Sequence, residues 1–591
     1  MSFSNNFPTI KPSLLLDFAN TKQLDPRITF TRASTATYYD GKTTAMAEQN
    51  LLTYSQDFDN AAWAKYQSTV TANVIAAPDG TTTADKVIAT AVSGSHVIYQ
   101  SAGTNGIQQF VSVYAKAAEY TNLQICLNGT GSSNAVFDLT AVTATSVIGT
   151  TASITSVGNG WYRCVAVMTP QANTAVAIQG FPAGATANNY GNIFTGDGTS
   201  GIYIWGAQVE QRSSVTAYTA TTTAPITNYI PVLQTAASGV ARFDNNPTTG
   251  ESLGLLIEEQ RTNLLTYSSD YSNAAWNKSS ASITTAANVA PDGTVTAQKI
   301  ISSAAFGQAY QLVSKATSAV TYAYSVYAKA GELSNFQLYV DSTPSGAGQY
   351  LRVNLATGSL ISQGSTGTGS AFVSYSITSV GNGWYRLVLV MTSDASNNVQ
   401  AHLSCIDSGS GFGGIYIWGA QLEAGAFATS YIATTSAQVT RAADAAGMTG
   451  TNFSSWFKAD EGTVYAESTF PQVTSSRVVD LWANSTNYIA VFRSGSNLVG
   501  EVYNGSSQAF LSIASSNNNK FTLSYKVNDV AASLNASAVS TDTVATMPST
   551  TPSTLYIGAY GGGGNIINGT IKKIAYYPAR IPNNQLQALT S

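Results

Sequence analysis

Tryptophans at matching places in two copies of one stretch are the residues of this chain best suited to binding chemistry. A flat indole ring stacks on the C–H face of a sugar, while nearby amides and carboxylates bind its hydroxyls. Each copy has three of them, and the six are Trp63, Trp161, Trp205, Trp276, Trp384 and Trp418. Trp161 and Trp384 follow a Gly-Asn-Gly turn, so these two are our candidates for carbohydrate binding. The alternative is core packing, which stays open for both and is favoured for Trp205 and Trp418.

Aromatic residues in the loops that differ between the copies are a second set of candidates. These are Tyr190 and Phe194 in the first copy and Phe412 in the second. Variable loops commonly carry function on a constant framework. We therefore predict that these rings contact carbohydrate and that the two copies differ in what they bind.

Carboxylates of the same two copies indicate a candidate metal site. Asp79, Asp85 and Glu210 place oxygen atoms on a loop and on a distant strand, which would suit a structural Ca²⁺ ion. The second copy keeps Asp292 and Glu423 but has glutamine in place of Asp85. Because Asp-Gly is also an ordinary turn, we favour no cofactor and keep structural calcium as the alternative.

Catalytic groups are poorly represented. His96 and His402 are the only histidines, and they do not occupy matching positions. A depolymerase would need two carboxylates across a cleft. The last part of the chain offers five acids for such a pair: Asp460, Glu461, Glu467, Asp480 and Glu501. Concanavalin-like glycosidases usually carry paired acids on one strand, in the manner E-x-D-x-x-E, and these five acids do not show that spacing. We therefore predict no enzyme activity and no catalytic residues.

An internal duplication sets the organisation of the chain. "NLLTYSQDFDNAAWAK" begins at residue 50, and "NLLTYSSDYSNAAWNK" begins at residue 263. "SITSVGNGWYR" occurs unchanged at 153–163 and at 376–386. These copies are far longer than solenoid repeats, so we expect two duplicated domains. The three cysteines are Cys126, Cys164 and Cys405, and this odd, sparse count argues against a disulfide framework.

The pattern inside the copies is that of β-strands. In "GIYIWGAQVE" (201–210), strict alternation places Ile202 and Ile204 on one face and Tyr203, Trp205 and Val209 on the other. Apolar residues on both faces are typical of a buried strand. We therefore interpret this stretch, which returns at 414–423, as framework. A short helix is expected only over residues 583–589.

The whole sequence predicts an all-β fold: three β-sandwich (jelly-roll) domains in tandem plus a small N-terminal β element, with very little helix. Only 10% of the 591 residues are charged, and the net charge of −4 favours neither nucleic acid nor an anionic membrane as partner. The expected domains are an attachment segment at 1–46, module 1 at 47–228, a connecting segment at 229–262, module 2 at 263–436, a linker at 437–447 and a final sandwich at 448–591. Segments 1–46 and 229–262 should pair as a small β unit that carries module 1 as an insertion.

Four stretches, in this order, carry a resemblance to a known class. "DPRITFTRASTATYYDG", "GVARFDNNPTTGESLGLLIEEQRTNLLTYS", "ATSYIATTSAQVTRAAD" and "GTIKKIAYYPARIPNNQLQALT" resemble tail-fibre and virion-surface proteins of tailed bacteriophages. The resemblance implies that the copies are carbohydrate-binding-module-like jelly rolls and that 448–591 is a concanavalin/laminin-G-like sandwich. A second module is a departure from the commoner pattern.

The resemblance implies a virion structural protein for multivalent adhesion to host surface glycans. Other virion proteins would bind its N-terminal segment, host polysaccharide would be the other partner, and the chain would be a homo-oligomer such as a trimer. It would be made in the bacterial cytoplasm without membrane insertion and displayed on the tail or capsid. Two alternatives stay open: a capsid or tail decoration protein that binds no sugar, and a glycan depolymerase.

Overall fold

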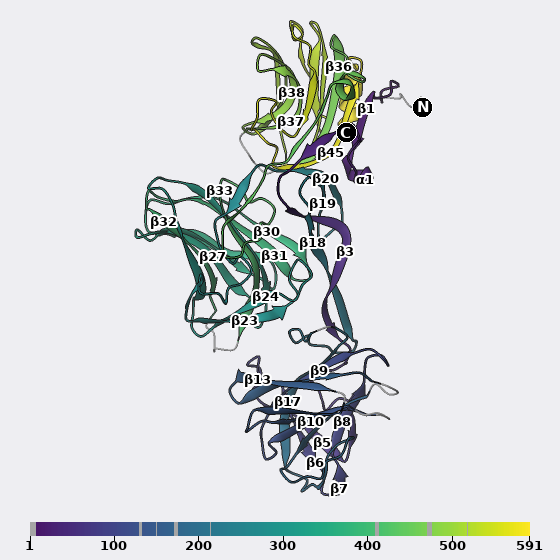
Figure 1. The fold of residues 1–591 in the computed structure, drawn as a ribbon, viewed down its shortest axis with the longest axis vertical. Coiled ribbons are helices and arrows are strands. Elements are labelled where there is room, and N and C mark those ends of the chain that lie inside the picture. The colour runs from purple at the N-terminus through teal and green to yellow at the C-terminus, as the bar shows by residue number, and fades with distance from the viewer. Residues whose placement is uncertain are drawn as a thin grey trace.

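The computed structural model describes residues 7–128, 133–148, 150–170, 175–212, 214–407, 413–469, 475–516 and 518–591. Every strand pairing within these ranges is antiparallel, and the strands form several packed sheets. Figure 1 shows three sandwiches, with module 1 at one end, module 2 in the middle and the final sandwich at the other end. The all-β, multi-sandwich prediction is confirmed.

Each module consists of two six-stranded sheets, which we name the front sheet and the back sheet. In module 1 the front sheet runs β12 (Thr143–Ile148), β11 (Asn134–Asp138), β10 (Asn122–Asn128), β15 (Ala175–Phe181), β8 (Val97–Ser101) and β4 (Ala64–Tyr66). Its back sheet runs β13 (Thr151–Gly158), β14 (Trp161–Met168), β9 (Gln109–Lys116), β17 (Gly201–Glu210), β6 (Ala84–Ala89) and β5 (Ser68–Ile75). A short pair, β7 (Ser93–Ser95) and β16 (Ile193–Thr195), lies beside them.

Module 2 repeats this order. Its front sheet runs β22 (Asn277–Ser279), β25 (Gly307–Ser314), β32 (Asn398–Cys405), β27 (Asn335–Thr343), β28 (Ala347–Asn354) and β29 (Ser359–Thr366). Its back sheet runs β23 (Ala281–Asn288), β24 (Ala297–Ser302), β33 (Gly414–Ala424), β26 (Thr321–Ala330), β31 (Trp384–Thr392) and β30 (Ala371–Gly381). The same strand order in both modules agrees with a duplicated domain.

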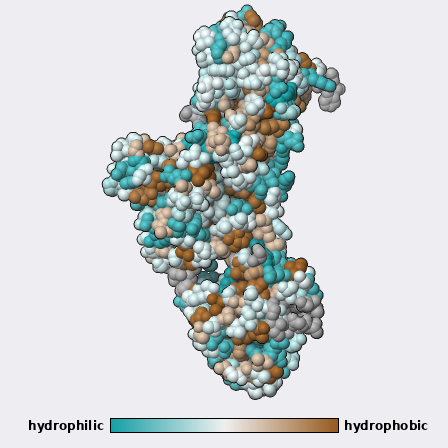
Figure 2. Space-filling model, viewed as in Figure 1, coloured by the Kyte–Doolittle hydropathy of each residue, from teal (hydrophilic) through white to brown (hydrophobic). Residues whose placement is uncertain are grey.

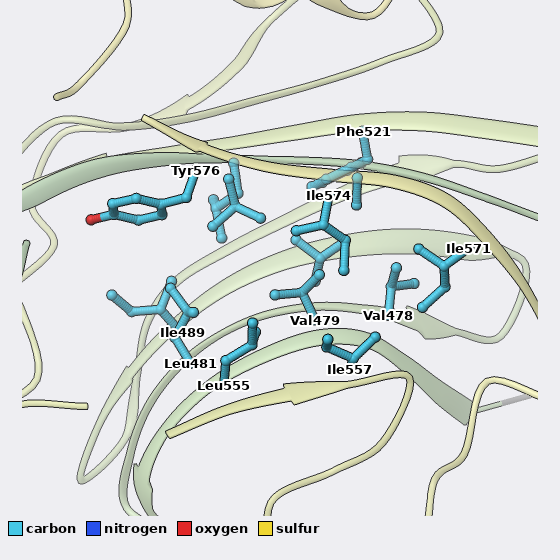
Figure 3. Close-up of a cluster of buried hydrophobic side chains, with 14 of the residues drawn as sticks. Val478, Val479, Leu481, Ile489, Phe521, Leu555, Ile557, Ile571, Ile574 and Tyr576 are labelled. Carbon is cyan, nitrogen blue, oxygen red and sulfur yellow. The ribbon is translucent and has the colours of Figure 1, made fainter. Parts of the chain in front are cut away.

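The final sandwich uses strands from the whole length of the chain. One sheet runs β19 (Arg242–Asn245), β20 (Ser252–Ile257), β45 (Gly569–Tyr577), β36 (Glu461–Thr469), β41 (Asn518–Lys526), β42 (Val530–Leu534) and β43 (Ser540–Asp542), with β1 (Leu14–Asp17) also paired to β45. The other runs β2 (Thr29–Thr31), β35 (Ala445–Thr449), β44 (Thr554–Ile557), β37 (Ser475–Asn484), β38 (Asn487–Ser494), β39 (Asn497–Asn504) and β40 (Ser507–Ala514). Figure 3 shows the aliphatic core between them, with Val479 and Ile574 among its residues.

The expected small β unit is found only in part. Segments 1–46 and 229–262 do pair, through the long strands β3 (Ala36–Asn50) and β18 (Ile226–Ala236), which form a two-stranded ribbon. Their shorter strands instead join the final sandwich, where Leu14, Leu16 and Leu255 are buried in its core. The described part of the N-terminal segment is therefore built into the molecule rather than forming a separate arm. The difference arises because apolar side chains of these segments complete a core that 448–591 alone leaves incomplete.

The ribbon packs on the back sheet of module 2 (Figure 1). Tyr39 and Ile230 of the ribbon are buried against Tyr327 and Trp384 of the module. Lys329 forms an ion pair with Glu48 of the ribbon. Burial of apolar surface on both partners makes the ribbon and module 2 one packed unit.

A buried ionic junction joins the ribbon region, module 2 and the final sandwich. We define it as Arg32, Arg242, Glu258, Arg441 and Asp444. Asp444 accepts from Arg32 at 3.0 Å and from Arg242 at 2.6 Å, and Glu258 accepts from Arg242 at 2.8 Å. Burial alone would raise the pKa of Glu258, but the charges of Arg441 and Arg242 outweigh it and hold that pKa at about 2. Three of the four stretches that carry the phage resemblance meet here.

Strand β17 confirms most of the predicted alternation. Ile202 and Ile204 face the core of module 1, whereas Tyr203 and Trp205 face the other side of the sheet. Val209 was expected beside Trp205 and lies instead in the core. The register shifts between Trp205 and Gln208, where Gly206 has a φ of 61°, so a β-bulge turns the following residues over.

Helix is confined to three short segments in the part of the chain that the structure describes: α1 (Phe18–Thr21), α2 (Thr451–Ser454) and α3 (Asn583–Leu589). The last confirms the predicted helix. None of the three is long and apolar enough to cross a membrane. Figure 2 shows hydrophobic residues scattered among polar ones on the visible surface.

Candidate functional site

The tryptophans predicted to bind sugar are buried, so that prediction is wrong. Trp161 is 2% exposed, and its indole nitrogen donates to the carbonyl oxygen of Ala76 at 3.0 Å. Trp384 is fully buried, and its nitrogen donates to the carbonyl of Val289 at 3.1 Å. Neither ring has a face free for a ligand. The packing interpretation of Trp205 and Trp418 is confirmed, because both are also buried.

The carboxylates predicted to bind calcium each have local partners. Asp79 and Asp292 close turns by accepting from Thr81 and Thr294. Glu210 and Glu423 are buried and accept from the loop that follows their strand, through the backbone nitrogens of Thr216 and Thr429 at 3.0 Å.

Asp85 is buried and accepts from the backbone nitrogens of Phe58 and Asn73, both at 2.9 Å. Within the described residues, no three His, Cys, Asp or Glu side chains are grouped to hold a metal ion. The contacts of these five carboxylates support local structural roles, and the calcium alternative stays a prediction.

The loop aromatics of module 1 lie on a segment that covers its own front sheet. Phe194 packs against His96, with ring centroids 4.6 Å apart, and Tyr190 is 44% exposed. Phe412 lies outside the described residues. Tyr190 is the more exposed of the two described rings, and Phe194 is half-buried between His96 and Tyr120.

Residues 182–200 of module 1 fold over the front sheet and hydrogen-bond to it. The side chain of Gln179 donates to the carbonyl of Asn192 at 2.9 Å, and the side chain of Gln124 accepts from the backbone nitrogen of Asn192 at 3.0 Å. The Gln124 amide also donates to the carbonyl of Asn188 at 3.0 Å. The amide nitrogens of Gln179 and Gln124 are thus bonded from within the module, whereas Oε1 of Gln179 has no partner among the described residues.

The same face of module 2 carries aromatic and polar side chains in an ordered array. Between β32 and β33 the chain runs only from residue 406 to residue 413, where module 1 has 182–200. Strand register aligns Tyr310, His402, Tyr339 and Tyr350 in one row across β25, β32, β27 and β28. We call this row the aromatic row.

Polar rows flank the aromatic row on both sides. One row consists of Gln308, Ser404, Gln337 and Arg352. The other contains Gln400 and Asp341. The three tyrosines are half-buried, and Phe306 at the edge is 46% exposed. The face therefore offers ring surfaces with hydrogen-bonding groups on either side.

His402 links the two polar rows through the aromatic row. Its Nδ1 lies 3.1 Å from Oε1 of Gln308, and its Nε2 lies 3.0 Å from Oδ1 of Asp341. The imidazole stacks on Tyr310 with ring centroids 5.1 Å apart and an interplanar angle of 24°, and Tyr339 packs on its other side at 5.0 Å. Burial raises the pKa of Tyr339, against the opposing hydrogen bond with Thr366. The phenol is thus neutral at physiological pH and can donate or accept.

Module 1 has different residues at the corresponding positions. The buried Gln100 and Gln311 both accept from the backbone nitrogen of the threonine at the module start, which fixes the correspondence between the copies. Tyr99 then corresponds to Tyr310, whereas Ala177 stands in place of His402 and Cys126 in place of Tyr339. Cys126 is buried in a small apolar cluster with Ala177 and Val97, and burial raises its thiol pKa to about 12.

Sequence reasoning missed this face because it considered the tryptophans shared by the copies and the aromatic residues of the variable loops, but not the framework strands in which the copies differ. The signal lay in the differences: "GQAYQLVS", "NFQLYVDST" and "NVQAHLSC" alternate apolar residues with Tyr, Gln, His and Asp. In a strand, such alternation separates a core face from an outer one. His402, which has alanine at the corresponding position of module 1, was the clearest of these differences.

Each acid considered for a depolymerase has a partner in the structure, and strand register places Asp480 and Glu501 in one row with Ala490 between them. Asp480 is buried and accepts from the backbone nitrogen of Gly561 at 3.1 Å, and burial raises its pKa to about 6. Glu501 accepts from the hydroxyls of Tyr488 and Ser507 at 3.0 and 2.9 Å. Glu461 pairs with Lys458 at the surface. Asp460 also lies beside Lys458, and Glu467 accepts from Tyr465.

No family model and no curated protein matches the sequence. Three solved structures that it is similar to are the Ruminococcus gnavus IT-sialidase CBM40 bound to α2,3 sialyllactose, the CBM22-1–CBM22-2 tandem domain of Paenibacillus barcinonensis Xyn10C, and the LG1-3 region of the laminin α2 chain. Identities are 12%, 8% and 11%, with TM-scores of 0.21, 0.19 and 0.20. The matches cover 23%, 66% and 84% of this chain and 84%, 100% and 98% of those chains. At such scores the likenesses carry no conclusion about function.

Proposed function

We propose that this chain is a non-catalytic virion structural protein of a tailed bacteriophage and that the front face of module 2 binds glycans of the host surface. The observation that carries the glycan part is the aromatic row of module 2, which is flanked by hydrogen-bonding side chains and lies where the connection from β32 to β33 is shorter than the segment 182–200 of module 1. The phage part rests on the four sequence stretches given above.

The chemistry of the face suits a sugar ring. Tyr310 and Tyr339 offer ring surface on which the C–H groups of a sugar can pack. Asp341 accepts hydrogen bonds from hydroxyls, while Gln308 and Gln400 can both donate and accept. Such a site is weak by itself, and many copies on one particle would raise the overall avidity by orders of magnitude.

Matched variants in the two modules test the glycan part. Tyr310→Ala removes a ring of the aromatic row, and Tyr99→Ala removes the corresponding ring of module 1. On an array of bacterial surface polysaccharides, the full chain should bind at least one glycan. Tyr310→Ala should weaken that binding about tenfold, a change of about 1.4 kcal/mol. Tyr99→Ala should leave it unchanged.

Two results would reject the glycan part. One is the absence of binding to every glycan at millimolar concentration, which would favour the decoration alternative. The other is an equal loss from both variants, which would place the binding elsewhere. Release of reducing ends from any polysaccharide would overturn the non-catalytic part.

The virion part needs a separate test. An antibody against module 2 should label intact phage particles of the host from which the chain comes, at the tail or the capsid. A map of the particle would then show whether the chain is a homo-oligomer and which protein it contacts. Absence of the chain from purified particles would contradict this part of the proposal.

A further inference from the structure

The guanidinium of Arg352 stands at one end of the polar row beside the aromatic row, and its charge has no acidic partner. Within the described ranges, no Asp or Glu oxygen forms an ion pair with it. The nearby acid Asp341 lies on the other side of the aromatic row and pairs with His402 at 3.0 Å. A fixed positive charge is thus present at one edge of the candidate glycan site.

Three neighbours hold Arg352 in one orientation. Its Nε donates to Oε1 of Gln337 at 2.8 Å. Its Cζ lies 4.4 Å from the ring centroid of Tyr350 and 5.3 Å from that of Phe306. Contact with rings and one hydrogen bond restrict the side chain before a ligand arrives, which lowers the entropic cost of binding.

The two terminal nitrogens of this guanidinium make no hydrogen bond to any described residue. An arginine fork binds carboxylate, sulfate or phosphate oxygens through two parallel hydrogen bonds. At the corresponding place module 1 has Val136, which cannot bind an anion. The charge is therefore a property of module 2 and not of the duplicated framework.

We propose that the front face of module 2 selects acidic glycans and that Arg352 holds the anionic group of the sugar through its two terminal nitrogens. This inference rests on the proposed glycan binding and adds the ligand class. The sugar ring lies along the aromatic row, its anionic group is at Arg352, and its hydroxyls reach Asp341 on the opposite side. That orientation keeps the two negative charges apart.

The test uses the full chain and probes that differ only in charge. The acidic probes are oligogalacturonates and sulfated galactose oligomers. Their uncharged counterparts are the same oligogalacturonates with every carboxylate methyl-esterified and neutral galactose oligomers. Bacterial surface polysaccharides with and without uronic acids are printed on the same array. The variants are Arg352→Gln, Arg352→Lys and, as a charge-matched control on the final sandwich, Lys526→Gln. Circular dichroism and thermal unfolding check that each variant folds.

We expect binding to acidic probes, with a loss of about tenfold to a hundredfold in Arg352→Gln, because this variant lacks the charge-assisted hydrogen bonds of the guanidinium. Arg352→Lys should restore only part of the affinity, because an ammonium lacks the fork. Lys526→Gln should bind like the natural chain. Preference for the carboxylated or the sulfated probes identifies the anionic group.

Each remaining outcome is decisive. Equal binding to neutral and acidic probes, or an Arg352→Gln variant that keeps its preference for acidic ones, overturns this inference while leaving glycan binding intact. Binding to no probe in any form overturns both. Loss of the acidic preference in Lys526→Gln as well would mean that net charge, and not Arg352, selects the ligand.

Discussion

At the scale of single residues, the duplication supplies an internal comparison for each buried polar group. Asp85 of module 1 and Gln298 of module 2 have the same role as hydrogen-bond acceptors for a loop backbone. Asp85 accepts from the backbone of Phe58, and Gln298 accepts from the backbone of Tyr271 at 2.8 Å. One is an acid and the other is not, so only in module 1 does the side chain at this position itself titrate. The comparison explains why the second copy can have glutamine in place of Asp85. Both side chains accept hydrogen bonds from the backbone of a loop, and neither charge nor a metal ion is needed for that role.

Asp85→Gln should therefore make the chain more stable above pH 6. Burial raises the pKa of Asp85 from 3.8 to about 6. Between these values the unfolded chain loses the proton before the folded chain does, so the free energy of unfolding falls as pH rises through this window. Glutamine cannot ionise, and the variant should show no such fall. Urea unfolding at pH 4, 5, 6 and 8 measures it.

Asp85→Ala is the control for the lost acceptor. It leaves two backbone donors unpaired and should destabilise the chain by about 1–3 kcal/mol at pH 4, where Asp85 is protonated, and by less at pH 8, where the natural chain has itself lost stability. An Asp85→Gln variant that is less stable than the natural chain at pH 8 would show that the carboxylate charge, and not its acceptor geometry, is what this position needs.

At the scale of elements, the ribbon shows what the sequence could and could not indicate. The pairing of segments 1–46 and 229–262 was predictable from the sequence. Neither segment belongs to the duplicated stretch, and the two segments lie on either side of its first copy. The surface to which the ribbon binds was not, since strand alternation marks an outer face without saying what covers it. The same limit explains the front faces: residues 182–200 fold over that of module 1, whereas module 2 has a shorter connection, 406–413, at this place. Bulges are a second limit, because one glycine at 206 reverses the side on which Val209 lies.

Two glycines at corresponding turns measure the contact between ribbon and module 2. Gly293 has a φ of 79°, and a Cβ there would lie 3.0 Å from side-chain atoms of Ala45 and Val232 of the ribbon. Gly80 has a φ of 87°, and a Cβ there would meet nothing within 4 Å. The positive φ makes alanine unfavourable at both positions by a similar amount. Only Gly293→Ala also strains the packing between module 2 and the ribbon. It should cost about 1 kcal/mol more than Gly80→Ala.

Thermal unfolding of the two variants gives that difference directly. Equal destabilisation would mean that the ribbon yields without cost or is not packed on module 2 in solution.

At the scale of the whole molecule, the buried ionic junction fixes how the parts are joined. Its side chains come from five places between Arg32 and Asp444, and Ser430 of module 2 donates to Glu258 at 2.7 Å through its backbone nitrogen. No local sequence pattern indicates that these charges meet, because they are spread over more than four hundred residues. The core of the final sandwich was likewise hidden, since it depends on strands that precede module 1 and on strands that lie between the two modules.

Glu258→Gln should destabilise the buried ionic junction. Removing one partner of a buried ionic group costs about 3–5 kcal/mol. In the natural chain the pKa of Glu258 is lowered from 4.5 to about 2, so its contribution is complete above pH 4.5 and is lost as pH falls through about 2. Calorimetry at pH 7 should show a lower transition temperature. An unchanged transition would mean that the junction contributes nothing net.

Hydrogen–deuterium exchange of the full chain, with and without a glycan found on the array, tests most directly whether module 2 binds through its front face. We expect slower exchange in β25, β27, β28 and β32 on binding, with no change in β8, β10 and β15 of module 1. Protection in the front sheet of module 1, in the final sandwich, or nowhere in module 2 would contradict the account.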